Sequence, residues 1–409
     1  VGTGALCDIT TTQDNTAIGY DAARDSTANY TTAIGSEAVF KTTGDANTGV
    51  GYRALMCNTS GTANVGLGYQ AGCVTSTGNY NTSIGYRSMR NNTTASNNTG
   101  VGVETLLCNT TGTSNLALGA YAMCKNTTAA NNTAVGVAAL LVNTTGAENV
   151  AIGRDALVAN TTGEQNTAVG LNALASNTTA GYNTAVGSCV LNANTTGTGL
   201  TGVGHIALIK NTTGANNTAL GYDALGENTT ASENTAVGYN SLKVNTTGTR
   251  NTTLGYRTMC SNTTGGANVA LGNNALFTNS TGDNNIAIGR DALFANTTAD
   301  NNTAVGFCAL AANTTGNLNQ SFGAFSLQAN TEGVRNTAIG SYAMYDNTTG
   351  DHNVAVGQSA LYNNETADGN TAVGYVSLNA NTTGANNTSV GKDSLKVNTT
   401  ASNNVAVGF

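Results

Sequence analysis

Apolar residues recur along this chain at a fixed spacing of 17 residues. Measured from one glycine, the spacing holds from Gly51 to Gly408 without a slip, and two intervals of 16 residues separate Gly19, Gly35 and Gly51. A representative copy, residues 234–250 (NTAVGYNSLKVNTTGTR), defines positions 1 to 17 of the repeat. A fixed period of this length indicates one supersecondary unit stacked many times.

Two apolar columns stand out within the copy. Position 4, just before the glycine, is apolar in every copy, and position 9 is nearly always Leu or Met, as in Leu55 and Met89. Positions 3, 5 and 8 hold small residues, for example Ala236, Gly238 and Ser241. We therefore expect positions 4 and 9 to form the core, and the small column on the opposite face of the strand to form a flat surface for close approach.

The repeat favours strands over helices. Regular glycine, paired Thr and doubled Asn oppose a helix, no helical apolar stripe is present, and the NTTG-like segment after position 9 is typical of turns. We predict an all-β fold, a parallel β-solenoid (β-roll) with one copy per rung, two short strands per rung, about 24 rungs and about 4.8 Å between rungs. Residues 1–409 are expected to form one continuous array that belongs to a longer chain or filament.

The composition argues against several classes of function. The chain has 9% charged residues, a net charge of −7 and no run of one sign, which argues against nucleic acid as a partner. No segment approaches the roughly 18 consecutive apolar residues of a membrane span. The composition is poor in the bulky residues of a globular core, since aromatic residues make up 5% of the chain and Trp is absent. These features favour a structural protein.

The string NTAVGYxSL resembles the β-roll head repeats of trimeric autotransporter adhesins, and the NTAVG and NTTG arrays resemble those of bacterial and phage tail-fibre-type proteins. The likeness covers essentially the whole chain, for example residues 166–170 and 302–306. It implies side-by-side association, plausibly as a homotrimer, and an extracellular or cell-surface location. The small-residue surface would be the interface; the alternative is that small residues merely fit a tight coil.

Asparagine occupies position 12 of nearly every rung and begins the acceptor pattern for N-glycosylation, Asn-x-Ser/Thr. Thr75 replaces it once, and Asn330 lacks the hydroxyl residue. The candidate acceptors are Asn58, Asn92, Asn109, Asn126, Asn143, Asn160, Asn177, Asn194, Asn211, Asn228, Asn245, Asn262, Asn279, Asn296, Asn313, Asn347, Asn364, Asn381 and Asn398. An outward amide at each would coat the rod in covalent glycans. The alternative is a structural Asn ladder of turn residues.

A second set of sequons falls at the junction between copies, at position 17. Its members are Asn97, Asn131, Asn216, Asn301 and Asn386. These residues would add a second row of glycans.

The cysteines show no CxxC spacing of a zinc site. Cys57 with Cys73, and Cys108 with Cys124, join position 11 of one rung to position 10 of the next, at about 6 Å between Cα atoms, which is within disulfide range. We expect these two disulfides, with small buried thiols as the alternative. Cys7, Cys189, Cys260 and Cys308 have no partner on a neighbouring rung.

No enzyme signature is found, and we expect neither catalysis nor a cofactor. His205 and His352 stand apart, and nucleophile-elbow, Walker, HExxH and GGxGxD motifs are absent. Tyr at position 6 predicts partial aromatic ladders. The leading prediction is an extracellular filament or fibre shaft whose chains associate with one another end to end, side by side or both. The alternative is an adhesin or phage-type receptor-binding fibre, with surface glycans as partners. Thr columns at positions 2, 13 and 14 leave a third alternative, ice binding.

Overall fold

A computed structural model describes residues 2–7 and 11–409. Within these residues it contains 24 strands of three residues each and no helix. The chain divides into two compact units, the first ending at Val203 and the second beginning at Gly204. Each unit by itself is a parallel β-solenoid with about 17 residues per turn, as the repeat predicted.

The first unit holds twelve strands: β1 Thr16–Ile18, β2 Thr32–Ile34, β3 Thr48–Val50, β4 Val65–Leu67, β5 Thr82–Ile84, β6 Thr99–Val101, β7 Leu116–Leu118, β8 Thr133–Val135, β9 Val150–Ile152, β10 Thr167–Val169, β11 Thr184–Val186 and β12 Thr201–Val203. The second holds β13 Thr218–Leu220, β14 Thr235–Val237, β15 Thr252–Leu254, β16 Val269–Leu271, β17 Ile286–Ile288, β18 Thr303–Val305, β19 Gln320–Phe322, β20 Thr337–Ile339, β21 Val354–Val356, β22 Thr371–Val373, β23 Thr388–Val390 and β24 Val405–Val407.

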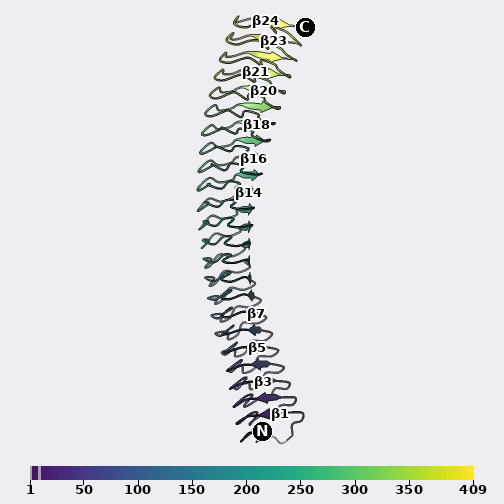
Figure 1. The fold of residues 1–409 in the computed structure, drawn as a ribbon, viewed down its shortest axis with the longest axis vertical. Helices are drawn as coiled ribbons and strands as arrows, with labels where there is room; N and C mark the ends of the chain where they lie inside the picture. Colours follow the sequence, from purple (N-terminus) through teal and green to yellow (C-terminus); the bar gives the residue numbers. More distant parts are fainter. Residues whose placement is uncertain (1, 8–10) are drawn as a thin grey trace. The chain divides into compact units, whose positions relative to one another are not determined.

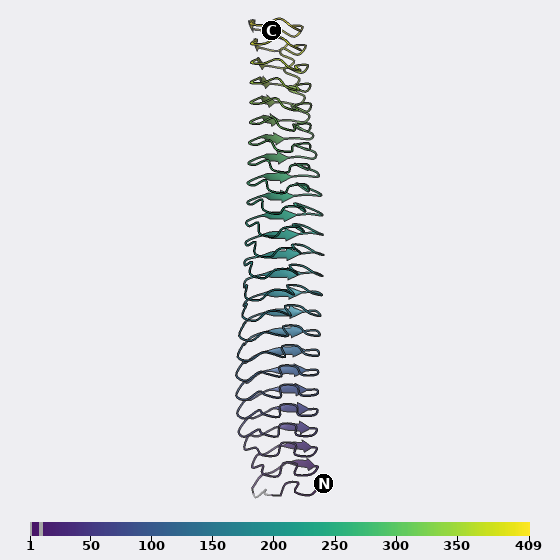
Figure 2. The same ribbon diagram turned by 90° about the vertical axis from the view of Figure 1, so that its left-hand side faces the viewer.

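Strands of neighbouring rungs pair in parallel and in register. Thr235 of β14 lies beside Thr252 of β15, and Val237 lies beside Leu254. Figure 1 shows the strands of each unit stacked one above another, and in Figure 2 the arrows of neighbouring rungs run nearly parallel. Because the register repeats, every column of the sequence becomes a row of like side chains.

The prediction of two strands per rung is wrong, because each rung has one. After the strand and its glycine, Asn240 and Leu242 both have φ of 52°, in the left-handed region rather than the β region. The backbone nevertheless bonds to both neighbouring rungs. Asn240 N donates to Tyr222 O at 3.0 Å, and Leu242 N donates to Thr258 O at 2.9 Å. Hydrogen bonds between rungs thus replace the second strand.

The core differs from the prediction at position 4. Ala236, at position 3, is fully buried, as is Leu242 at position 9, whereas Leu254 at position 4 of the next rung is 52% exposed. The strands alternate, so position 3 points inward while positions 2 and 4 point outward. The small column is therefore the interior of the coil and cannot be the surface for chain association that we expected.

Glycine at position 5 allows the rungs to stack closely. Gly136 has φ of 134°, a conformation that residues with a side chain rarely adopt. A Cβ atom there would lie 2.5 Å from the carbonyl oxygen of Gly153 on the next rung. Since no such contact is tolerated, the backbone geometry explains why this column is always glycine.

Candidate functional site

The position-12 asparagines form a buried ladder in the interior of each unit. Asn126 Nδ2 donates to Oδ1 of Asn109 on the previous rung at 2.8 Å and to the carbonyl oxygen of Ala129 at 3.1 Å. Its own Oδ1 accepts from Asn143 Nδ2 at 3.2 Å. Both halves of the amide are thereby satisfied without water, as a buried polar group requires.

A second ladder runs along position 1. Asn149 N donates to Oδ1 of Asn132 at 2.9 Å, and Asn149 Nδ2 donates to the carbonyl oxygen of Gly163 at 2.9 Å. Asn166 N continues the ladder by donating to Asn149 Oδ1 at 3.0 Å. The two Asn columns, with Ala at position 3 and Leu at position 9, fill the interior of the rung.

This geometry favours the ladder over the glycan coat at position 12. Every candidate acceptor except Asn398 has an exposed fraction of 0%. The Nδ2 atom that a glycan would substitute points inward and is used as a donor, as at Asn126. The expected outward orientation of these amides is therefore wrong, and a glycan on Nδ2 would not fit within a folded rung.

The junction asparagines, unlike those at position 12, lie at the surface. Asn97, Asn131, Asn216, Asn301 and Asn386 are all exposed. Each has a positive φ, between 56° and 61°, which Asn adopts more readily than most residues. Their side chains thus remain accessible on the folded chain.

The two cysteine pairs lie on neighbouring rungs, as the spacing predicted, but all eight cysteines are free thiols. Cys57 N donates to Cys73 O at 2.9 Å, and Cys108 N donates to Cys124 O at 3.0 Å. Burial raises the pKa of Cys73, and the neighbouring Cys57 adds to the rise; burial and Cys108 do the same for Cys124. Both buried thiols therefore carry little thiolate at neutral pH, which slows oxidation and alkylation. The predicted disulfides are absent from this structure.

The position-6 aromatic ladders are confirmed. Tyr52, Tyr69 and Tyr86 stack with ring centroids 5.3 Å apart at each step. His205 belongs to a similar stack, 5.5 Å from Tyr222. It therefore continues an aromatic ladder.

A pocket of about 560 Å³ opens where the repeat is irregular, beside the two 16-residue intervals. Its lining combines aromatic, apolar and charged side chains: Tyr20, Asp21, Arg24, Glu37, Phe40, Lys41, Met56, Cys57 and Thr59. Only the shortened intervals distinguish this region in the sequence, and they do not by themselves predict a binding site.

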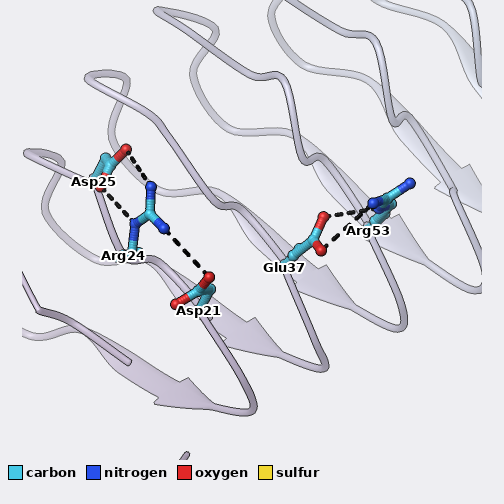
Figure 3. Close-up of polar contacts among 5 residues, drawn as sticks. All are labelled: Asp21, Arg24, Asp25, Glu37 and Arg53. Carbon is cyan, nitrogen blue, oxygen red and sulfur yellow. Dashed lines mark hydrogen bonds and ion pairs between the residues drawn. The ribbon is translucent and has the colours of Figure 1, made fainter. Parts of the chain in front are cut away.

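Ion pairs organise the charged residues at this pocket (Figure 3). Arg24 bonds to Asp21 at 3.3 Å and to Asp25 at 3.0 Å, while Arg53 bonds to Glu37 at 2.7 Å. The Arg24 guanidinium also lies over the Phe40 ring, 4.2 Å from its centroid. Tyr20 at the same pocket is 57% exposed. An exposed ring beside fixed polar groups can stack on and hydrogen bond to a polar ligand.

Within residues 2–7 and 11–409, no group of three or more His, Cys, Asp or Glu side chains is placed to hold a metal ion. The same residues contain no helix that is long and apolar enough to cross a membrane.

The chain matches no model of a known protein family and no curated protein.

Proposed function

We propose that this chain is a structural, self-associating shaft of an extracellular fibre or filament. The observation that carries the proposal is the uniformity of the rungs. Strand length and register are the same from β3 to β24 within each unit, and the Asn ladders run along the same columns. A shaft needs the same surface and the same contacts over its length, and this repeat provides both.

The internal ladders suit a load-bearing rod. Each interior rung bonds to the rungs above and below through its backbone and through its Asn amides, as Asn126 does. Amides carry no charge, so the interior needs no ion pair that acid or salt would weaken. Separating two rungs requires several of these bonds to break together, which opposes fraying from within.

Any glycan on this shaft is proposed to sit at the junction asparagines rather than at position 12. Asn131 is exposed while Asn126, in the same rung, is fully buried. Mapping glycopeptides of the secreted chain tests this assignment. Sugar on Asn126 would contradict it.

Electron microscopy of the purified chain tests the shaft. We expect filaments that lengthen or thicken as concentration rises, with a fibre-diffraction repeat of about 4.8 Å along their axis. Chains that stay dispersed at every concentration would contradict the proposal.

A second candidate, a receptor-binding fibre, is favoured by one observation, the pocket beside Tyr20. Its exposed ring and fixed ion pairs suit a saccharide.

Tyr20→Ala is expected to lower the affinity for glycan by at least about tenfold, because the variant loses one ring that stacks on the sugar. Tyr80→Ala is the control, because Tyr80 is 64% exposed and does not line the pocket. Binding of both variants and the unmodified chain to a glycan array measures the effect. Equal binding by Tyr20→Ala and the unmodified chain would contradict a receptor-binding role for this pocket.

A further inference from the structure

The outward face of the strands is an unusual surface. Positions 2 and 4 of every strand point outward, and none of the 24 strands in the described residues has a charged residue at either position. Position 2 is Thr in most strands, and position 4 is Val, Ile, Leu or Phe throughout. We call this surface, made by positions 2 and 4 of the strands in each unit, the strand face.

Its apolar side chains are substantially open to solvent. Leu67 is 44% exposed, Leu118 is 43% exposed and Ile152 is 40% exposed. The position-4 side chains form a continuous apolar row along each unit, beside a row that is mostly Thr. Contiguous exposed apolar residues of this kind mark interaction sites.

We propose that the strand face packs against the strand face of a second copy of this chain. This inference rests on the proposed shaft and names the surface through which its chains associate. Two charge-free faces meet without burying an unpaired charge, which would otherwise oppose association. Two sheets that pack face to face with interdigitated side chains are a common arrangement, with about 10 Å between the sheets.

The strand face of one unit supplies most of the area that a stable contact needs. Twelve stacked strands, each about 10 Å long and about 4.8 Å from the next, give about 570 Å² of flat surface in each unit. Each partner of a stable complex buries about 800 Å². The position-6 row beside the strands, with exposed rings such as Tyr69 and Tyr239, widens the surface with a residue type that is enriched in interfaces. The same row also holds Arg154 and Arg290, whose side chains are largely exposed, so cations lie at the edge of the strand face and not within it.

The strand faces of two copies have the same spacing between rungs. Moving one copy along the other by one rung therefore restores an equivalent set of contacts. Copies can therefore associate with a stagger. Staggered lateral contacts join chains into a fibre longer than any one chain.

An ordered water lattice is the rival occupant of a flat Thr-rich face. The side chains on the face vary in size, however. Leu116 and Ile286 replace Thr at position 2, and Phe322 replaces the smaller apolar residues at position 4. A protein partner can repack around such changes, whereas an ice surface requires even spacing. The face thus favours a second copy.

The test places charges on the strand face and, in a matched variant, elsewhere on the same rungs. The face variant is Leu67→Lys, Leu118→Lys and Ile152→Lys. The control variant is Thr77→Lys, Thr128→Lys and Thr162→Lys, at exposed position-14 residues. Circular dichroism establishes that both fold. Light scattering and electron microscopy then measure association.

We expect the unmodified chain and the control variant to associate, and the face variant to associate about a hundredfold more weakly or to remain as single rods, because lysines would be buried against one another. If the face variant assembles as well as the control, the strand face is not the interface, while the shaft proposal stands. If the unmodified chain does not assemble, both proposals fail. Thermal hysteresis from dispersed single chains would assign the face to ice and overturn the inference.

Discussion

Replacing Asn126 by Asp is expected to destabilise its region of the solenoid by about 3 kcal/mol or more at neutral pH. The change is almost isosteric, but it removes the two hydrogen bonds that Nδ2 donates to Asn109 Oδ1 and Ala129 O. It also places a carboxylate oxygen against two acceptors in a site that is 0% exposed. Denaturant unfolding and hydrogen exchange of the neighbouring rungs measure the loss.

The effect of Asn126→Asp depends on pH in a defined direction. Burial without a cation raises the pKa of the new carboxyl group in the folded chain above its unfolded value of about 3.9. The ionisation penalty is therefore absent below about pH 3.9, grows as pH rises from there, and is constant above the folded pKa. Part of the destabilisation remains in acid, because a protonated carboxyl group has one donor where the amide has two.

Asn131→Asp is the matched control for this prediction. Asn131 lies in the same rung, but it is exposed and has φ of 60°, which Asp also tolerates. We expect its effect to stay within about 0.5 kcal/mol. Equal losses for the two variants would show that position 12 is not a buried ladder.

Replacing Gly136 by Ala is expected to have a comparable effect from a different cause. A φ of 134° alone costs a residue with a side chain about 1–3 kcal/mol, and the new methyl group would also meet the backbone of Gly153 at 2.5 Å. The rungs on either side must move apart, which weakens their hydrogen bonds. We expect a lower unfolding midpoint and faster hydrogen exchange around β8 and β9.

Gly266→Ala provides the comparison. Gly266 is at position 16, its φ is not in the positive range that restricts Gly136, and the nearest atom to an added Cβ, the carbonyl oxygen of Thr249, is 3.0 Å away. The repeat already accepts Ala at this column, as at Ala215. A small effect for Gly266→Ala beside a large one for Gly136→Ala confirms the role of position 5, and a small effect for both contradicts it.

The sequence was sufficient to predict the period, the parallel stacking and the buried Leu column. These follow from a register that is kept over the whole chain, because each column must become a row. Leu242 is fully buried, and the Tyr52 stack follows its column.

Hydrophobicity alone led to the wrong prediction that position 4 is part of the core. An apolar residue in every copy resembles a core column, yet the interior of a 17-residue coil is narrow, and residues such as Ala236, Leu242 and the two Asn columns fill it. The position of the small residue decides which face is inward. Since strand neighbours point to opposite faces, a buried Ala at position 3 forces position 4 outward.

The predicted second strand and the predicted outward orientation of the position-12 amides were wrong for related reasons. Leucine at a positive φ is uncommon, so Leu242 gave no signal of a left-handed conformation. A turn asparagine and a buried ladder asparagine have the same sequence pattern. Only the path of the backbone, which turns position 12 inward, separates Asn126 from the exposed Asn131.

Electron cryomicroscopy of the assembled filaments at side-chain resolution tests the central claim most directly. The account predicts one strand per rung, Asn side chains stacked along the interior, and strand faces of neighbouring chains packed against each other. Filaments whose chains meet through another surface would contradict the interface. A preparation that contains only separate chains, or rungs whose position-12 asparagines point outward, would contradict the account as a whole.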